Sequence, residues 1–422
     1  MKVLAGWQQA PHATRLAHAG PKPWRSWTPM DWALSLALAL FGFFATASVA
    51  GVYMAQGLML LLAVPLAPRI GRLAPWKSPP MAAGLLLLAY IILHSLWFSG
   101  FTPASWHMVN SYQELILAPL LFALLQLAPD RRVFSRALIA GAVVFACIHW
   151  VGFWLPQPRL GSFLESRRIS AGFGFALCAF MLLVQARTHA RPWALRALAA
   201  FFAVTLLFAA AGRTGYLVLV LLVGVAAWQH SPPRWRWVAG LLLPIVVLGL
   251  AWSSSVVQKR VHETVENAQP TGQVNTTSTG IRVHMLQIAE QLAHAHPLLG
   301  VGFANYGEAH SAVVRQMYAN DPEGYARLPQ TWRFTSNPHS EYLMQLLGGG
   351  VPALLLFVGW LGMTLREAWH TRNTVSHMLC GFCLAFALGC VFNSLLLDFV
   401  EGHLYMALLA WLLARHASTR PI

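Results

Sequence analysis

The chain has 422 residues, of which 57% are hydrophobic and only 10% charged, and its formal net charge is +15. Soluble domains carry charge on about a quarter of their residues, so this composition excludes an ordinary water-soluble surface and predicts an integral membrane protein. The Lys and Arg residues occur in short clusters between apolar runs, without a basic stripe of interleaved aromatics, so the charge does not indicate nucleic-acid binding.

Twelve apolar segments are long enough to be membrane-spanning helices, since about 20 apolar residues cross the hydrocarbon of a bilayer. Several neighbouring segments are joined by very short turns, as in helical hairpins. The sequence therefore predicts an all-α integral membrane protein with about 12 transmembrane helices. The predicted spans are 31–50, 52–68, 81–98, 112–128, 133–154, 170–186, 195–211, 214–229, 237–254, 340–365, 376–397 and 402–415.

The Lys and Arg residues are divided unequally between the two sets of connections. Nineteen of the 29 fall in the N-terminal tail, in alternate connections and after the last span, and ten fall on the other side. Cytoplasmic loops carry the excess of positive charge, so this division predicts a multi-pass protein of the bacterial inner membrane with both termini in the cytoplasm. The ten other cations are expected on the periplasmic face, where topology does not explain them.

One connection is much longer than the rest. Residues 255–338 are polar and separate the ninth and tenth spans, so they predict a large periplasmic loop. Within it, Ile281, Met285, Ile288 and Leu292 recur at helical spacing and predict a helix from Ser278 to His294. Residues 1–30 lack an apolar core followed by a cleavage site, which favours a cytoplasmic tail over a signal peptide. The predicted layout is a tail at 1–30, helices one to nine at 31–254, the loop at 255–338, helices ten to twelve at 339–415 and a cytoplasmic tail at 416–422.

Neither the cysteines nor the acids have the pattern of a metal site. All five cysteines lie inside predicted spans, where small apolar packing residues are expected. Cys380 and Cys383 form a CxxC pair without a second pair or a His cluster in the same aqueous segment. Glu263 and Glu266 are an isolated carboxylate pair. The sequence therefore predicts chemistry without a metal ion or another cofactor.

His339 is the candidate catalytic residue, because it lies where the long loop re-enters the membrane. A neutral imidazole accepts a proton from an attacking hydroxyl. Pro338 favours the first position of a helix, so we expect His339 in the first turn of the tenth span, where the helix dipole lowers its pKa. Three histidines compete in the same loop, and a polar interfacial histidine without a catalytic role is the alternative. The competitors are His294, His296 and His310.

Arg213 lies between the seventh and eighth spans, where an unpaired cation is costly. Its planar guanidinium suits phosphate oxygens. The alternative is a structural ion pair, with Glu114 or Asp398 as the partner. The pattern leaves both roles open.

Three more arginines lie on the predicted periplasmic side. Arg282 is close to the start of the predicted loop helix, where anions are favoured, although a lone arginine at this place is usually solvated. Arg167 and Arg168 precede the sixth span and either bind a substrate or extend to lipid headgroups. With His339 they predict an enzyme that acts on a lipid-linked phosphate or diphosphate. The alternative to an enzyme is a transporter, which would need a central polar pathway or repeated halves.

Four ordered segments are similar to a known family. They are TGIR at 279–282, HPLLGVGFANY at 296–306, NPHSEYL at 337–343 and GGGVP at 348–352. With these segments and its twelve spans, the chain resembles the O-antigen ligase and polymerase superfamily. The resemblance implies a fold similar to that of GT-C glycosyltransferases.

Within this superfamily the chain is most similar to the lipopolysaccharide O-antigen ligases. The resemblance implies transfer of O-antigen polysaccharide from undecaprenyl diphosphate to a sugar hydroxyl of lipid A-core on the periplasmic face. It implies inverting chemistry that needs no metal, with His339 as the essential histidine. The residues that it implies for binding of the donor diphosphate are Arg213, Arg282, Arg167 and Arg168. The neighbours expected to support the site are Asn337, Glu341 and Tyr342.

The resemblance leaves the acceptor open. The family often has Asn after the histidine, where this chain has Ser340. A related O-antigen polymerase or protein O-oligosaccharyltransferase would use the same donor with another acceptor. The partners expected are the undecaprenyl-diphosphate-linked O-antigen, lipid A-core and membrane lipids, with no nucleic acid.

Overall fold

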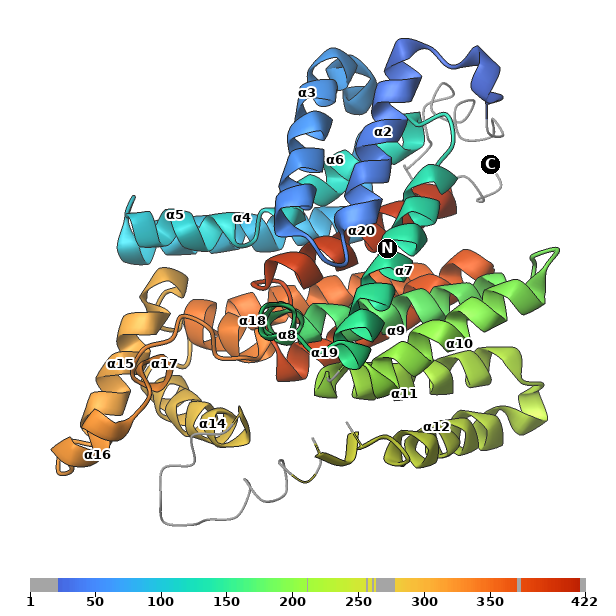
Figure 1. Ribbon diagram of the computed structural model, residues 1–422. Coiled ribbons are helices and arrows are strands. Elements are labelled where there is room, and N and C mark those ends of the chain that lie inside the picture. Colours follow the sequence, from blue (N-terminus) through green and yellow to red (C-terminus); the bar gives the residue numbers. More distant parts are fainter. Residues whose placement is uncertain are drawn as a thin grey trace.

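The computed structural model describes a helical membrane protein (Figure 1). Its described residues form helices joined by short connections, with no β-strand among them. This confirms the predicted class of an all-α integral membrane protein. The residues described are 22–210, 212–255, 257–259, 262, 278–369 and 373–417, and the carboxylate pair at 263 and 266 lies outside them.

A helix stands at each of the twelve predicted spans. By length and composition, eight helices of the described residues can cross a membrane, and α2 and α10 are shorter apolar helices. The remaining two, α11 and α20, carry charged residues. The bounds are α2 (Pro29–Phe44), α3 (Val49–Leu73), α4 (Pro79–Ser99), α6 (Glu114–Leu127), α7 (Arg132–Trp154), α9 (Arg168–Gln185), α10 (Pro192–Phe208), α11 (Arg213–His230), α12 (Arg236–Trp252), α18 (Glu341–Trp369), α19 (Thr374–Phe392) and α20 (Phe399–Ala417).

Local signals set where several of these helices begin. Thr28 accepts a hydrogen bond from the backbone N–H of Asp31, whose carboxylate in turn accepts from the N–H of Thr28. This reciprocal cap satisfies two of the free N–H groups at the start of α2. Asn373 caps α19 by accepting from the N–H of Ser376. Short polar residues before an apolar run therefore fix the starts of these two helices.

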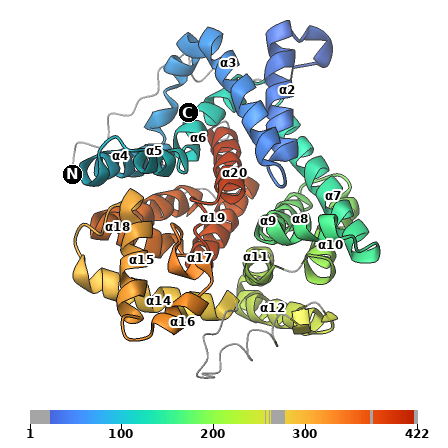
Figure 2. The same cartoon turned by 60° about the vertical axis from the view of Figure 1, so that its left-hand side comes forward.

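The centre and the edge of the bundle differ in burial. Every residue of α20 from Val400 to Ala414 is buried, and it lies near the middle of the helices in Figure 2. By contrast, Ala251 is the only buried residue of α12. The bundle is therefore built around α20 and its neighbours α9 and α19, with α12 on the outside.

The tenth span differs from its prediction, because α18 is broken at Gly350, where φ is +72°. The N–H groups of Val301 and Gly302 donate to the carbonyl oxygens of Leu347 (2.8 Å) and Gly348 (3.0 Å). The turn at 300–302 thus bonds to the backbone carbonyls just before the break. A side chain at Gly350 would collide with the carbonyl oxygen of Leu298, so glycine is required there.

The segment between α12 and α18 forms a small helical unit at one end of the bundle (Figure 2). Its helices are α14 (Ser278–Ala295), α15 (Tyr306–Met317), α16 (Pro322–Arg327) and α17 (Gln330–Arg333). The predicted loop helix is confirmed as α14, and its apolar face is buried at Met285, Ile288 and Leu292. Ile288 and Leu292 pack with Tyr306 and Trp332, so this unit has an apolar core of its own.

Candidate active site

His339 lies in the connection between α17 and α18. Its backbone φ is +53°, a left-handed conformation that residues other than glycine rarely adopt. Helix α18 begins two residues later, at Glu341. The expectation that His339 occupies the first turn of the tenth span is therefore wrong, and so is the helix dipole as the cause of a lowered pKa. The chain turns sharply at His339 before the helix starts.

Asn337 holds this turn in place. Its Oδ1 accepts a hydrogen bond from the backbone N–H of His339 (2.8 Å), and its Nδ2 donates to Oδ1 of Asp398 (3.4 Å). The hydroxyl of Thr335 accepts from the N–H of Asn337 (3.1 Å). The strained conformation of His339 is thus fixed from both sides of the turn, and Asp398 ties it to the connection between α19 and α20.

Glu341 organises the same connection from within the protein. Its side chain is fully buried and accepts hydrogen bonds from the hydroxyl of Tyr112 (3.0 Å) and Nε2 of Gln345 (2.8 Å). Its other oxygen accepts from the N–H groups of Leu396 (3.0 Å) and Leu397 (3.4 Å). Glu341 therefore positions the segment that carries Asp398, and through it the turn at His339.

Tyr342 contacts the neighbouring helix α19 and the interior of α18. Its hydroxyl donates to the carbonyl oxygen of Ala387 in α19 (3.1 Å), and its ring packs edge to face on Phe357. These contacts join α18 to α19. Tyr342 thus acts on the packing of the helices beneath the site.

Three of the four candidate arginines come together. Burial lowers the pKa of Arg282, and the nearby charges of Arg213 and Arg168 lower it further. Arg168 and Arg213 are the first residues of α9 and α11, and Arg282 lies in the second turn of α14. Arg168 and Arg213 thus both lie within electrostatic range of Arg282, and both stand at helix N-termini. Both the guanidinium groups and the free N–H groups of such helix ends favour a bound anion.

His339 belongs to the same cluster. Burial lowers the pKa of its imidazole, and the positive charge of Arg282 lowers it further. The ring is consequently neutral at neutral pH, the form in which a histidine accepts a proton. We call Arg168, Arg213, Arg282 and His339 the arginine–histidine cluster.

The two neighbouring arginines differ in their surroundings. Arg168 forms an ion pair with Glu165, besides its place beside Arg282. Arg167 instead lies within electrostatic range of Glu401, a buried acid of α20 that accepts a hydrogen bond from Ser170 (2.8 Å). The two adjacent arginines thus have different acidic neighbours, Glu165 for Arg168 and Glu401 for Arg167.

The comparison with protein families bears on this cluster. Residues 198–358 match a family described as O-antigen ligase. The chain thus contains a segment of the O-antigen ligase family. The search of curated proteins gave no match.

The segment matched to the O-antigen ligase family runs from α10 into α18. It includes Arg213, Arg282 and His339 of the cluster, together with Asn337. Arg168 and Asp398 lie outside it and are brought to the same place by the fold. The matched segment therefore contains three of the four members of the cluster.

The other histidines of the loop lie in different surroundings. His310 is fully buried among the helices of the small unit, and burial lowers its pKa to about 4. His294 and His296 are exposed at the far end of α14. At 1.5 Å per residue, His294 is about 18 Å along the helix from Arg282. Of these four histidines, His339 is the one that combines partial burial with an adjacent arginine.

The sequence offers two acids, Glu114 and Asp398, as partners for Arg213. Asp398 accepts the hydrogen bond of Asn337, and Glu114 is buried beside His403, with Oε2 and Nδ1 4.0 Å apart. The sequence thus missed Asp398 as a support of His339. Its signal was present, because an acid within an apolar stretch requires a partner, and the hydrogen bond from Asn337 is one that the sequence does not reveal.

Proposed function

We propose that this protein is a glycosyltransferase that moves O-antigen polysaccharide from undecaprenyl diphosphate to a sugar hydroxyl of lipid A-core. The observation that carries the proposal is the arginine–histidine cluster. It combines three cations, which suit a diphosphate, with a neutral imidazole, which suits a hydroxyl. The match to the O-antigen ligase family supports this class of reaction.

The donor diphosphate would be bound by Arg168, Arg213 and Arg282. Guanidinium groups form paired hydrogen bonds with phosphate oxygens, and the helix ends beside them add favourable dipoles. Binding of the donor by Arg167 as well remains a prediction from the sequence. Its place beside Glu401 favours a role in holding α9 against α20.

His339 would act as the general base. The acceptor hydroxyl gives its proton to the imidazole while its oxygen forms a bond to the anomeric carbon of the donor sugar. The bond from that carbon to the diphosphate oxygen breaks on the opposite face, so the configuration inverts and undecaprenyl diphosphate leaves with the electron pair. The leaving group departs as an anion stabilised by the arginines, so a single base is sufficient.

The cluster would face the periplasm of a Gram-negative cell. The excess of Lys and Arg in the opposite connections supports this orientation, with both chain termini in the cytoplasm. The layout proposed is the one given by the sequence, with residues 255–338 as the periplasmic segment between the ninth and tenth helices.

Transfer in a reconstituted system tests the proposal. Purified protein in liposomes is given undecaprenyl-diphosphate-linked glycan with equal amounts of lipid A-core, an acceptor peptide and free glycan repeat, in EDTA. We expect product on lipid A-core, without added metal. Product on the peptide or on the glycan would reassign the enzyme to protein O-glycosylation or to polymerisation. Absence of any transfer, with or without magnesium, would contradict the reaction class.

A further inference from the structure

A cavity of about 710 Å³ lies between α11, α12 and the adjoining ends of α18 and α19. Helix α11 connects it to the arginine–histidine cluster, because Arg213 is its first residue and Gln229, close to its last, lines the cavity. At 1.5 Å per residue, these two positions are about 24 Å apart. The cavity is therefore a second site, at the opposite end of the bundle.

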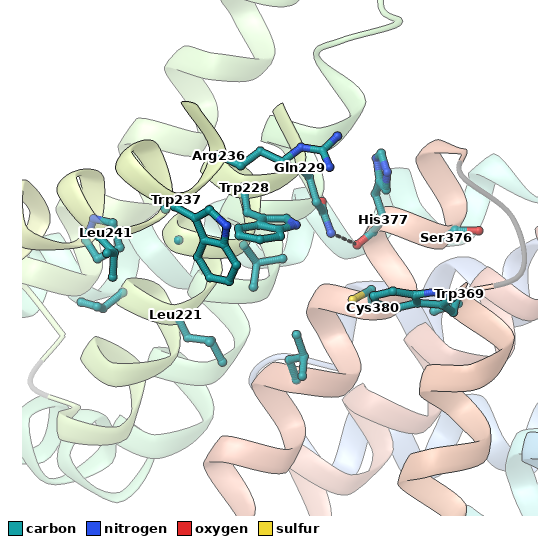
Figure 3. A pocket seen from close by; sticks show the side chains of 17 residues that line it. Leu221, Trp228, Gln229, Arg236, Trp237, Leu241, Trp369, Ser376, His377 and Cys380 are labelled. Atoms are coloured by element: carbon teal, nitrogen blue, oxygen red, sulfur yellow. Dashed lines mark hydrogen bonds between the residues drawn. The ribbon is translucent and has the colours of Figure 1, made fainter. Parts of the chain in front are cut away.

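Apolar side chains form most of its wall (Figure 3). The rings of Trp228 and Trp237 pack edge to face on one side, with centroids 4.1 Å apart, and Trp369 and Cys380 lie across from them. Trp237 and Trp369 are 71% and 77% exposed. Because exposed apolar side chains of a membrane-embedded helix meet lipid, the cavity opens toward the bilayer.

The position of α12 explains why the space exists. At Gly224 and Gly240 the backbones of α11 and α12 come close, and a Cβ at Gly224 would lie 3.1 Å from Cγ of Pro244. This close contact holds α12 against α11. The cavity occupies the side that faces α19, where Trp237 of α12 and Cys380 of α19 both line it.

The dimensions of the cavity fit one leaflet of a bilayer. Its wall extends from Val220 to Gln229 on α11, about 13 Å, and from Ser376 to Leu384 on α19, about 12 Å. Half of the hydrocarbon thickness of a bilayer is about 15 Å. The length of the cavity thus matches the depth of one acyl chain in a single leaflet.

Polar groups gather at the end nearest the membrane surface. Figure 3 shows Arg236 and Gln229 side by side, with His377 opposite, and Nε2 of Gln229 donates to the carbonyl oxygen of His377 (3.2 Å). His377 also lies within electrostatic range of Arg187 and His230. Neither Asp nor Glu is among the residues that line the cavity. This end is consequently complementary to an anion.

We propose that the cavity binds one anionic glycerophospholipid from the leaflet opposite the arginine–histidine cluster. The lipid phosphate accepts hydrogen bonds from Arg236 and lies in the field of Arg187. Nε of Arg236 donates a hydrogen bond to the carbonyl oxygen of Ser231 (3.5 Å). The two terminal nitrogens of its guanidinium group would donate to the phosphate. One acyl chain fills the space between Trp228 and Trp369 and joins α12 to the bundle. The proposal does not depend on the transfer reaction.

Native mass spectrometry of the full-length protein in mild detergent tests this site. The protein is supplied separately with phosphatidylglycerol, phosphatidylcholine and a polyprenyl phosphate. We expect one phosphatidylglycerol per chain, retained at least about fivefold better than phosphatidylcholine. Arg236→Gln should lower this retention about fivefold, since each basic residue at the membrane surface contributes on that order. Arg234→Gln, an exposed arginine outside the cavity, is the matched control and should bind as the wild type does.

A second variant addresses the apolar part of the site. Cys380→Trp fills the cavity and should abolish retention, with the far-ultraviolet circular dichroism of the wild type as the check of folding. Equal retention of phosphatidylcholine, or normal binding by Arg236→Gln, would overturn the proposal. Preferential retention of the polyprenyl phosphate would also overturn it, because the occupant would then be a lipid of another class.

Discussion

Arg282 lies close enough to His339 for its positive charge to lower the pKa of the imidazole. The two residues belong to different elements, α14 and the turn before α18. A cation that suits the donor diphosphate therefore also keeps the proposed base unprotonated before the donor arrives. A bound diphosphate would offset this charge and raise the pKa of His339, so donor binding and base strength are linked.

Neutralising Arg282 tests this link through pH dependence. In Arg282→Gln the cation that lowers the pKa of His339 is gone, so the pKa rises and the imidazole becomes protonated at a higher pH. The acid limb of the profile of kcat/KM against pH should therefore move to higher pH, and the KM for donor should increase. Arg315→Gln, at an exposed position of α15, should leave both unchanged. An acid limb that stays in place in Arg282→Gln would show that the two groups are not coupled.

The buried His310 predicts loss of stability in acid. Burial and the nearby His284 lower its pKa from 6.5 to about 4. The unfolded chain takes up the proton first as the pH falls. The contribution of neutral His310 to the free energy of unfolding is therefore complete above pH 6.5 and decreases as the pH falls toward 4. At pH 5 it is smaller by roughly 2 kcal/mol. Hydrogen exchange in α15, corrected for its intrinsic pH dependence, should accelerate over this range.

A pair of variants isolates this effect. His310→Leu should make the protection of α15 independent of pH, whereas His294→Gln, at an exposed position, should leave the pH dependence of the wild type. The same pH dependence in His310→Leu would assign it to another group.

The turn that meets the break in α18 should tolerate no side chain. Gly300 has a φ of +67°, and a Cβ there would collide with the carbonyl oxygen of Leu347. Gly300→Ala should therefore destabilise the protein by about 2 kcal/mol or more, seen as a lower midpoint of thermal unfolding in detergent. Gly359→Ala is the control, because this glycine of α18 has open space around it. Equal midpoints for the two variants would contradict the close contact.

The sequence predicted most of the fold because hydropathy is a local property. Each apolar segment carries its own signal, and so does the apolar face of α14. The break at Gly350 carries no such signal, because it depends on hydrogen bonds from residues 301 and 302 to the backbone before it. A run of three glycines permits the break without requiring it.

The candidate site was predicted in its residues and less well in its geometry. Pro338 is a local signal for a helix start. The backbone is determined instead by Asn337, which accepts a hydrogen bond from the N–H of His339 and donates one to Asp398. Likewise, the adjacent Arg167 and Arg168 look equivalent in sequence. Their neighbours in the fold distinguish them: Arg168 lies beside Arg282 of α14, and Arg167 beside Glu401 of α20. Both positions depend on how distant helices pack.

The proposed orientation can be tested with an impermeant thiol reagent. Asn320 is exposed in the segment proposed as periplasmic, and Lys77 is exposed between α3 and α4, on the other side. In a background with Cys147→Ser, Asn320→Cys should react in whole cells with a permeabilised outer membrane. Lys77→Cys should react only after the inner membrane is lysed. The reverse pattern would place the cluster on the cytoplasmic face.

The role of His339 as general base gives the most direct prediction. A sugar hydroxyl is a poor nucleophile at neutral pH, so loss of the base should lower kcat by roughly a hundredfold or more. Donor binding depends on the arginines and should persist. His339→Gln and His339→Ala should therefore still bind undecaprenyl-diphosphate-linked glycan, measured by microscale thermophoresis, and fail to transfer it.

Two further variants separate the base from its support. Asn337→Ala removes the acceptor that fixes the N–H of His339 and should lower kcat by a smaller factor, about tenfold, with the acid limb of the pH profile retained, because the imidazole is still present but less well placed. His296→Gln, at an exposed position on the far end of α14, should transfer at the rate of the wild type. If His339→Gln turned over within a few-fold of the wild-type rate, the acceptor proton would have to leave by another route, such as the donor diphosphate itself.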